Sequence, residues 1–153
     1  MNSKLNNLPP AMDAPRISEG SDSETAMNGL LQEVLARRKE RMAMEEPGKQ
    51  ALMRLFEVAQ RDTGQSRRVA SFLLGCYNGT RFPFDLTDFR DLDYELFDDC
   101  MTVLRMDSQP LQEVHRYFEN GGKRFEEMAQ RHGIRDVSKM EMDLKELRER
   151  YPS

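Results

Sequence analysis

The sequence is poor in the residues that build catalytic centres, redox sites and membrane spans. It holds two cysteines, two histidines and no tryptophan among 153 residues. It also lacks the HExxH, GxSxG, P-loop and GxGxxG patterns that mark common enzyme sites. No apolar run approaches the ~18 residues that a membrane helix needs. These absences argue against the common enzyme classes and against a membrane-spanning protein.

The few cysteines and histidines are expected to be structural. Cys76 and Cys100 each fall on the apolar face of a predicted helix, as small buried residues do in a reducing compartment. His115 and His132 are in phase with neighbouring apolar residues, which is typical of core or boundary histidines. A disulfide, a reactive thiol or a Cys–His nucleophile pair stays open, because spacing in sequence does not fix spacing in space. A zinc site needs three or four ligands at short spacing, so neither a metal nor a cofactor is expected.

The bulk composition describes a very polar protein with a small core. Apolar residues make up 38% and charged residues 33%, and the net charge is −4. That charge argues against a protein wrapped wholesale around nucleic acid, although a local basic patch remains compatible with it. The start of the chain has no apolar segment of the kind found in signal peptides, so we expect a cytoplasmic protein.

The pattern along the chain predicts an all-α fold. Residues 1–24 are rich in Asn, Pro, Ser, Gly and Asp and show no apolar periodicity, so we expect a disordered tail. Residues 25–153 are expected to form one compact helical domain, a bundle of five to seven short helices. Its core spans 47–132, with flanking helices at 25–44 and 137–150. No segment shows the alternation of a strand.

Helix boundaries follow from caps and breakers. Pro47 and Gly48 are expected to end the first helix and open a second, which is broken near residues 62–64. Further helices are expected at about 64–77, 93–106, 110–119 and 123–131, with a short capped helix near 85–89. Asp85 or Thr87 is the predicted N-cap of that short helix, and Asp93 the predicted cap of the helix that follows it.

A strong charge asymmetry divides the middle of the chain. Seven acids lie within fifteen residues, against Arg90 as the one base: Asp85, Asp88, Asp91, Asp93, Glu95, Asp98 and Asp99. A set of arginines precedes or adjoins them: Arg54, Arg61, Arg67, Arg68 and Arg81. The spacing of the aspartates does not fit a calcium-binding loop, because bulky residues separate them and the central glycine is missing.

Three interpretations of this asymmetry are open. The acids and arginines can pair internally, which would relieve the unfavourable placement of Arg67 and Arg68 at a helix start. The acids can instead form a surface that docks on a basic protein partner or imitates nucleic acid. The arginines can form a patch that holds a nucleic-acid backbone.

Part of the chain resembles a known but uncharacterised family. The residues that carry the resemblance are AQRDTGQSRRVASFLL (59–74), the pair Tyr77 and Asn78, FDLTDFRDLD (84–93) and DDCMTVL (98–104). This pattern is similar to that of a small helical domain carried by proteobacterial plasmids, integrative conjugative elements and related mobile DNA. Family members tend to have tryptophan before the asparagine, where this chain has Tyr77. The resemblance implies an accessory protein of a mobile element and supplies no activity, cofactor or catalytic residue.

Together these observations predict a non-enzymatic accessory protein that binds another protein through the acidic surface. The alternative is a nucleic-acid-binding accessory protein that uses the arginine patch. An enzyme that uses Cys76 or Cys100 with a histidine is the remote alternative. The sequence does not decide between a monomer and a homodimer, because the apolar stripe of the first helix can pack within the chain or against a second copy.

Overall fold

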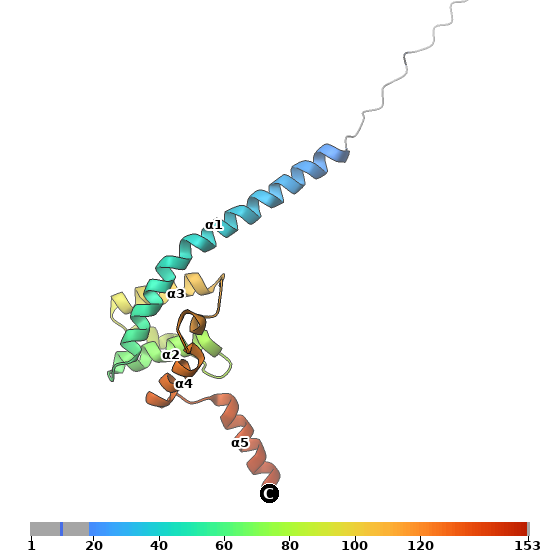
Figure 1. The fold of residues 1–153 in the computed structure, drawn as a ribbon. Helices are drawn as coiled ribbons and strands as arrows, with labels where there is room; N and C mark the ends of the chain where they lie inside the picture. The colour runs from blue at the N-terminus through green and yellow to red at the C-terminus, as the bar shows by residue number, and fades with distance from the viewer. Residues whose placement is uncertain (1–9, 11–18, 153) are drawn as a thin grey trace, which may run out of the picture. The chain divides into compact units, whose positions relative to one another are not determined.

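The computed structural model describes Pro10 and residues 19–152, and every regular element in these residues is helical. Figure 1 shows the elements in chain order. They are α1 (Glu19–Ala59), α2 (Gly64–Asn78), the 3-10 helix η1 (Leu86–Asp91), α3 (Tyr94–Asp107), the 3-10 helix η2 (Val114–Tyr117), α4 (Gly121–Arg131) and α5 (Val137–Arg150). The predicted all-α fold class is confirmed.

The first helix begins earlier than the sequence pattern predicted. Most of the predicted tail, residues 1–9 and 11–18, lies outside the described residues, but residues 19–24 form the start of α1. The Thr25 hydroxyl donates to the carbonyl of Ser21 at 2.8 Å within this first stretch. Two acids in the first turns, Asp22 and Glu24, favour a helix here because negative charge complements the positive end of the helix dipole.

The chain divides into two compact units, residues 1–37 and residues 38–153. Residues 19–37 of the first unit are helical, and an ion pair between Glu33 and Arg37 at 2.7 Å links successive turns. The second unit holds the hydrophobic core. It begins at Arg38, inside α1, whereas the sequence pattern placed the start of the domain at residue 25.

Helix α1 runs without interruption through Pro47, so the predicted stop at Pro47 and Gly48 is wrong. Proline removes one backbone donor from a helix, but here packing outweighs that loss. Gly48 is buried so closely against Met106 of α3 that an added Cβ would lie 2.4 Å from the Met106 Cβ. Fully buried Leu52 and Leu55 follow on the same helix. The two helices expected at 25–44 and 47–61 are therefore one element.

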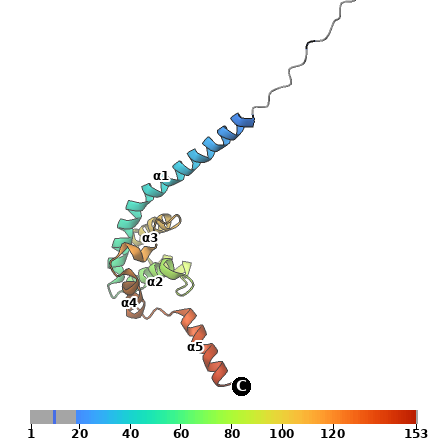
Figure 2. The same cartoon turned by 45° about the vertical axis from the view of Figure 1, so that its right-hand side comes forward.

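The core of the second unit lies between the C-terminal part of α1 and helices α2, α3 and α4, which gather against it in both ribbon views (Figures 1 and 2). Phe56 stands at the centre of an aromatic cluster, with ring centroids 4.3 Å from Phe118 and 5.7 Å from Phe125. Helix α2 contributes the apolar face predicted from its periodicity, including Val69, Phe72 and Leu73.

The helix expected from Pro110 onward does not form. Only one 3-10 turn, Val114–Tyr117, is present, and Leu111 is exposed rather than part of an apolar face. The chain turns sharply after it, because Asn120 adopts the left-handed conformation with φ of 51°. Gly121 then lies directly against the backbone carbonyl of His115. This close return of the backbone leaves no room for a regular helix of the predicted length.

Helix α5 belongs to the second unit and contacts the rest of it mainly through the residues at its start. The backbone N–H of Val137 donates to the carbonyl of Arg81 at 3.0 Å. Asp136 caps the helix by accepting from the backbone N–H of Lys139 at 3.2 Å. Beyond this point the predicted apolar stripe is solvent-exposed, with Leu144 and Leu147 each about half exposed.

Candidate functional site

The arginines and acids singled out in the sequence pair with one another at several separate places. Arg54 on α1 forms a two-pronged contact with Asp99 on α3, with distances of 2.9 and 2.7 Å to its two carboxylate oxygens. The hydrogen bond that Arg54 donates to the Asp99 carboxylate is the main cause of a raised Arg54 pKa. The Asp99 side chain is largely covered while the Arg54 side chain is 57% exposed, so this pair joins the two helices at the surface.

Arg68, in the first turns of α2, binds two aspartates of the acidic segment. It lies 2.9 Å from Asp88 and 2.8 Å from Asp91, both on η1. A helix start favours negative charge, so a cationic arginine there is unfavourable. The two aspartates offset this by placing negative charge beside Arg68. Asp85 caps η1, as predicted, by accepting from the Thr87 backbone at 2.9 Å. That backbone hydrogen bond is the first cause of a lowered Asp85 pKa.

Asp93 does not play the predicted capping role, because its side chain makes no capping hydrogen bond to α3. Gln65 of α2 binds it instead. The Gln65 amide donates to the Asp93 carboxylate at 2.8 Å and accepts from the Asp93 backbone N–H at 2.8 Å. Tertiary pairing with a neighbouring helix has replaced local capping, and it fixes the start of α3 against the start of α2.

Arg81 lies apart from the other arginines. Both terminal guanidinium nitrogens of Arg81 donate to the Glu126 carboxylate of α4, and the Nη2–Oε2 distance is 3.0 Å. The Arg81 Nε donates to the Asp136 carboxylate at 2.8 Å. Its hydrogen bonds are the main cause of lowered pKa values for both carboxylates. Arg81 therefore holds α4 and the start of α5, and it does not join the predicted arginine patch.

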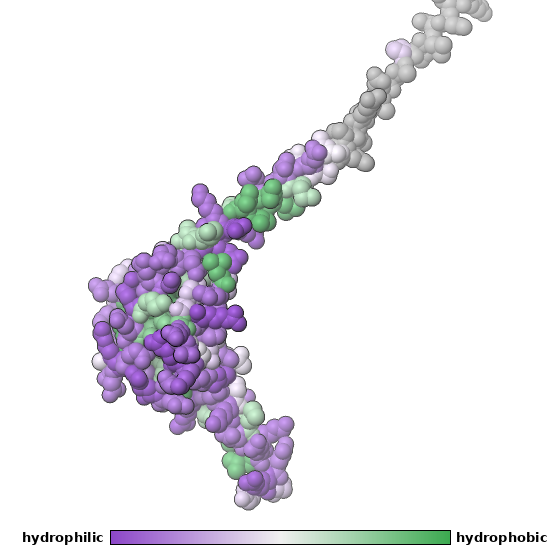
Figure 3. All heavy atoms as spheres, in the orientation of Figure 1, coloured by the Kyte–Doolittle hydropathy of each residue, from purple (hydrophilic) through white to green (hydrophobic). Residues whose placement is uncertain are grey.

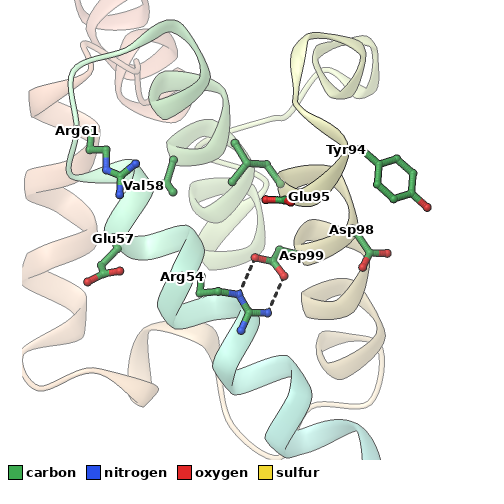
Figure 4. Close-up of a pocket in the computed structure, with 9 residues that line it drawn as sticks. Arg54, Glu57, Val58, Arg61, Tyr94, Glu95, Asp98 and Asp99 are labelled. Atoms are coloured by element: carbon green, nitrogen blue, oxygen red, sulfur yellow. Dashed lines mark hydrogen bonds and ion pairs between the residues drawn. The ribbon is translucent and has the colours of Figure 1, made fainter.

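A hollow of about 490 Å³ between the end of α1 and the start of α3 collects the charges that remain. Glu57 near the end of α1 and Arg61 in the turn after it line this hollow, and Figure 4 shows Glu57 on the side of α1 away from α3 and Tyr94 extending from the start of α3 away from α1. Glu95 and Asp98 are exposed, and neither forms an ion pair with any residue that the structure describes. Four acids and two arginines line the hollow: Arg54, Glu57, Arg61, Glu95, Asp98 and Asp99.

Two residues of this hollow were missed at the level of sequence. Tyr94 was not among the candidate residues, and 80% of its surface is exposed. Glu57 was not singled out, although it follows Arg54 by three residues on α1 and precedes Arg61, in the turn after the helix, by four. That spacing is the signal that identifies Glu57. No local pattern indicates that Tyr94 faces outward.

Arg61 and Arg67 are what remains of the predicted arginine patch. Both are exposed and neither forms an ion pair within the described part of the chain. They flank the turn between α1 and α2. A smaller hollow of about 350 Å³ lies beside Arg67 and is lined also by Arg68 and Asp91.

The cysteines and histidines do not form an activated nucleophile. Burial raises the pKa of the Cys76 and Cys100 thiols to about 12 in each case, so both stay protonated at neutral pH. A ring nitrogen of His132 lies 2.6 Å from the carbonyl of Ala59, and His115 packs edge-on against Tyr77. Among the described residues no group of three or more metal-ligating side chains comes together.

A comparison with protein-family models matches residues 49–133, more than half of the chain, to a family of unknown function, DUF7673. The chain belongs to the DUF7673 family. The matched range of this DUF7673 protein contains the C-terminal part of α1, then α2, η1, α3, η2 and α4, and thus every residue of the hollow. No curated protein and no solved structure matches the chain. None of the described helices is long and apolar enough to cross a bilayer.

Proposed function

We propose that this DUF7673 protein is a cytoplasmic, non-enzymatic accessory protein of a mobile genetic element, and that it binds a protein partner through the hollow between α1 and α3. The observation that carries the binding proposal is the exposed group Tyr94, Glu95 and Asp98 beside Glu57. The mobile-element context rests on the resemblance of residues 59–74 and 84–93 to domains carried by plasmids and integrative conjugative elements.

The composition of the hollow favours a basic partner. Of the acids that line it, Asp99 is neutralised by Arg54, which leaves Glu57, Glu95 and Asp98 against Arg61. An arginine or lysine side chain entering the hollow would find carboxylates from both helices. Tyr94 adds a large, rigid contact surface at the rim, a residue type enriched among interface positions that dominate binding energy.

The acidic surface proposed to bind is therefore smaller than the seven acids of the sequence pattern. Asp88 and Asp91 hold Arg68, Asp85 caps η1, and Asp93 binds Gln65. These four side chains stabilise the domain itself. Glu95 and Asp98 remain for a partner.

Affinity capture from the native host tests the proposal. The bait is the full chain, compared with an Asp98→Lys/Tyr94→Ala variant and with Asp143→Lys as a matched control on the exposed face of α5. We expect a protein that the wild type and the control both retain and that the double variant loses, with equal melting temperatures for all three. Equal capture by the double variant would refute the site.

Nucleic-acid binding is the second candidate, and the exposed Arg61 and Arg67 favour it. The measurement is binding to duplex and single-stranded DNA from about 50 to 200 mM salt, where phosphate contacts give a steep salt dependence. If Arg61→Ala/Arg67→Ala removed such binding while Asp98→Lys strengthened it, the arginine surface would be the functional one. Absence of binding even at the lowest salt would exclude it.

A further inference from the structure

The N-terminal half of α1 carries an apolar face that nothing in the described chain covers. Its residues, here called the α1 stripe, are Met27, Leu30, Leu31, Val34 and Leu35. Met27 is 67% exposed and even Leu35, the most covered, is 48% exposed. Figure 3 shows the corresponding apolar surface as a green patch on this part of the helix. A contiguous apolar surface of this kind marks an interaction site.

The residues on this face are spaced symmetrically along the helix. Glu24, Met27, Leu31, Leu35 and Arg38 follow one another at intervals of three, four, four and three residues. Those intervals keep all five positions on one side of an α-helix. The pattern therefore reads acid, apolar, Leu31, apolar, base, with Leu31 at its centre.

This symmetry fits a second copy of the same helix in antiparallel orientation. When two copies cross with Leu31 against Leu31, Met27 of each lies opposite Leu35 of the other. The same superposition sets Glu24 of each copy beside Arg38 of the other, because both lie seven residues from Leu31. In a two-fold pair each apolar side chain of the stripe's central row thus lies opposite another apolar side chain, and a Glu24–Arg38 pair forms at each end. This self-complementarity is what an isologous interface requires.

A parallel pair would lack this complementarity. It would set Glu24 against Glu24 and Arg38 against Arg38, and like charges side by side are unfavourable. A bilayer surface fits less well too, because helices that bind at the interface carry cations on the polar face and large aromatic anchors on the other. Residues 19–41 contain no aromatic residue, and Asp22, Glu33 and Glu40 place acids outside the stripe.

We propose that the chain self-associates as an antiparallel homodimer through the α1 stripe, with Leu31 on the two-fold axis and Glu24–Arg38 pairs at both ends. The interface is separate from the hollow between α1 and α3. Each dimer therefore presents two copies of that hollow.

The first test is sedimentation equilibrium, which measures the average mass of the full chain from about 1 to 200 µM. Dimerisation follows mass action and therefore increases with concentration. We expect the mass to rise from that of one chain to that of two. Leu31→Glu should abolish the rise, whereas Ala36→Glu, on the opposite face of the same helix, should leave it unchanged. A wild-type chain that stays monomeric throughout would overturn the proposal.

Charge exchange tests the orientation. Glu24→Arg alone places two repulsive pairs in an antiparallel dimer, and we expect about tenfold weaker dimerisation. Arg38→Glu should weaken it similarly, and the double exchange Glu24→Arg/Arg38→Glu should restore it. In a parallel dimer no exchange creates an attractive pair, so failure of the double variant to recover would overturn the antiparallel arrangement.

Cysteine cross-linking locates the two-fold axis. Under mild oxidation Leu31→Cys should form an inter-chain disulfide readily, whereas Met27→Cys should not, because Met27 faces Leu35 of the other copy. The native thiols are the same in both variants. Efficient cross-linking of Met27→Cys would indicate parallel helices. Loss of the dimer on Leu144→Glu would show that the exposed apolar face of α5 forms the interface instead. Either result would overturn the proposal.

Discussion

At the scale of single residues, two adjacent glycines have opposite roles. A Cβ added to Gly121 would fall on the backbone carbonyl of His115, whereas one added to Gly122 would meet nothing within 4 Å. Both lie in the first turn of α4. Only the first is required by the close return of the chain after Asn120.

We therefore predict that Gly121→Ala lowers the free energy of unfolding by about 3 kcal/mol, because the backbone must move to relieve the overlap. Gly122→Ala is the matched control and should be neutral or stabilising by up to about 1 kcal/mol through better helix propensity. Urea denaturation of both variants measures the difference. Equal stability would mean that the loop before α4 relaxes freely.

Arg81 joins three parts of the chain and makes their stability depend on pH. Its contacts lower the pKa of Glu126 and of Asp136 in the folded state. A depressed carboxyl pKa gives stability that is present above the unfolded values, about 4.3 for Glu and 3.9 for Asp, and is lost as pH falls below them. The network should therefore weaken on acidification and change little between pH 6 and pH 8.

Arg81→Met should reduce the stability of the domain at pH 7 by about 1–2 kcal/mol, a value that allows for the partial exposure of the network. The loss should be smaller at an acidic pH below the lowered folded-state pKa values of Glu126 and Asp136, where both carboxyls of the wild type are protonated. Arg135→Met is the control, because Arg135 is exposed and directly precedes Asp136 in the sequence. Denaturation midpoints measured at both pH values check this, and a pH-independent loss would show that Arg81 acts mainly through packing.

At the scale of elements, helix α2 begins with two arginines that behave differently. Arg68 binds Asp88 and Asp91 on η1, while Arg67 is exposed and forms no ion pair within the described residues. Position within one turn decides which arginine faces η1. The sequence indicated that both arginines are unfavourable at a helix start, but it did not indicate which of them pairs with the aspartates of η1.

Arg68→Ala should lower the stability of the domain by about 1 kcal/mol, because two carboxylates on η1 lose their partner. Arg67→Ala should leave stability unchanged or raise it by a few tenths of a kcal/mol, since it removes a cation from a helix start. Thermal unfolding at low and high salt distinguishes the two variants. A larger loss for Arg67→Ala would contradict the assignment of the internal pair.

Element boundaries show where local signals failed. The caps at Thr63, Asp85 and Asp136 accept the backbone hydrogen bonds that local chemistry favours. Pro47 did not end α1, and Pro110 did not open a helix. For Pro47 a distant residue bears on the outcome, because Met106 of α3 packs against Gly48. After Pro110 the chain instead folds back on itself locally, with the His115 carbonyl against Gly121.

At the scale of the whole molecule, the hydrophobic core is confined to one unit. Every buried apolar residue in the core lies between Ala51 and Ala129. The α1 stripe contributes nothing to that core. Folding of the second unit and self-association through the first are therefore separable properties.

A fragment of residues 38–153 should unfold cooperatively with a melting temperature close to that of the full chain at low concentration. It should remain monomeric at concentrations where the full chain dimerises, because it lacks the α1 stripe. Calorimetry and sedimentation measure the two properties separately. A fragment that failed to fold would show that residues 19–37 stabilise the core.

The sequence by itself determined the helical fold class, the apolar faces of α2 and α4, and the existence of an acidic and a basic group of residues. These follow from periodicity and composition, which are local. Only the tertiary structure decided which charges cancel, because Arg54–Asp99 and Arg81–Glu126 join residues 45 positions apart. It also decided which apolar faces are covered. The α1 stripe and the apolar stripe of α5 have the same kind of spacing as the buried face of α2, yet both stay exposed because no described part of the chain packs on them.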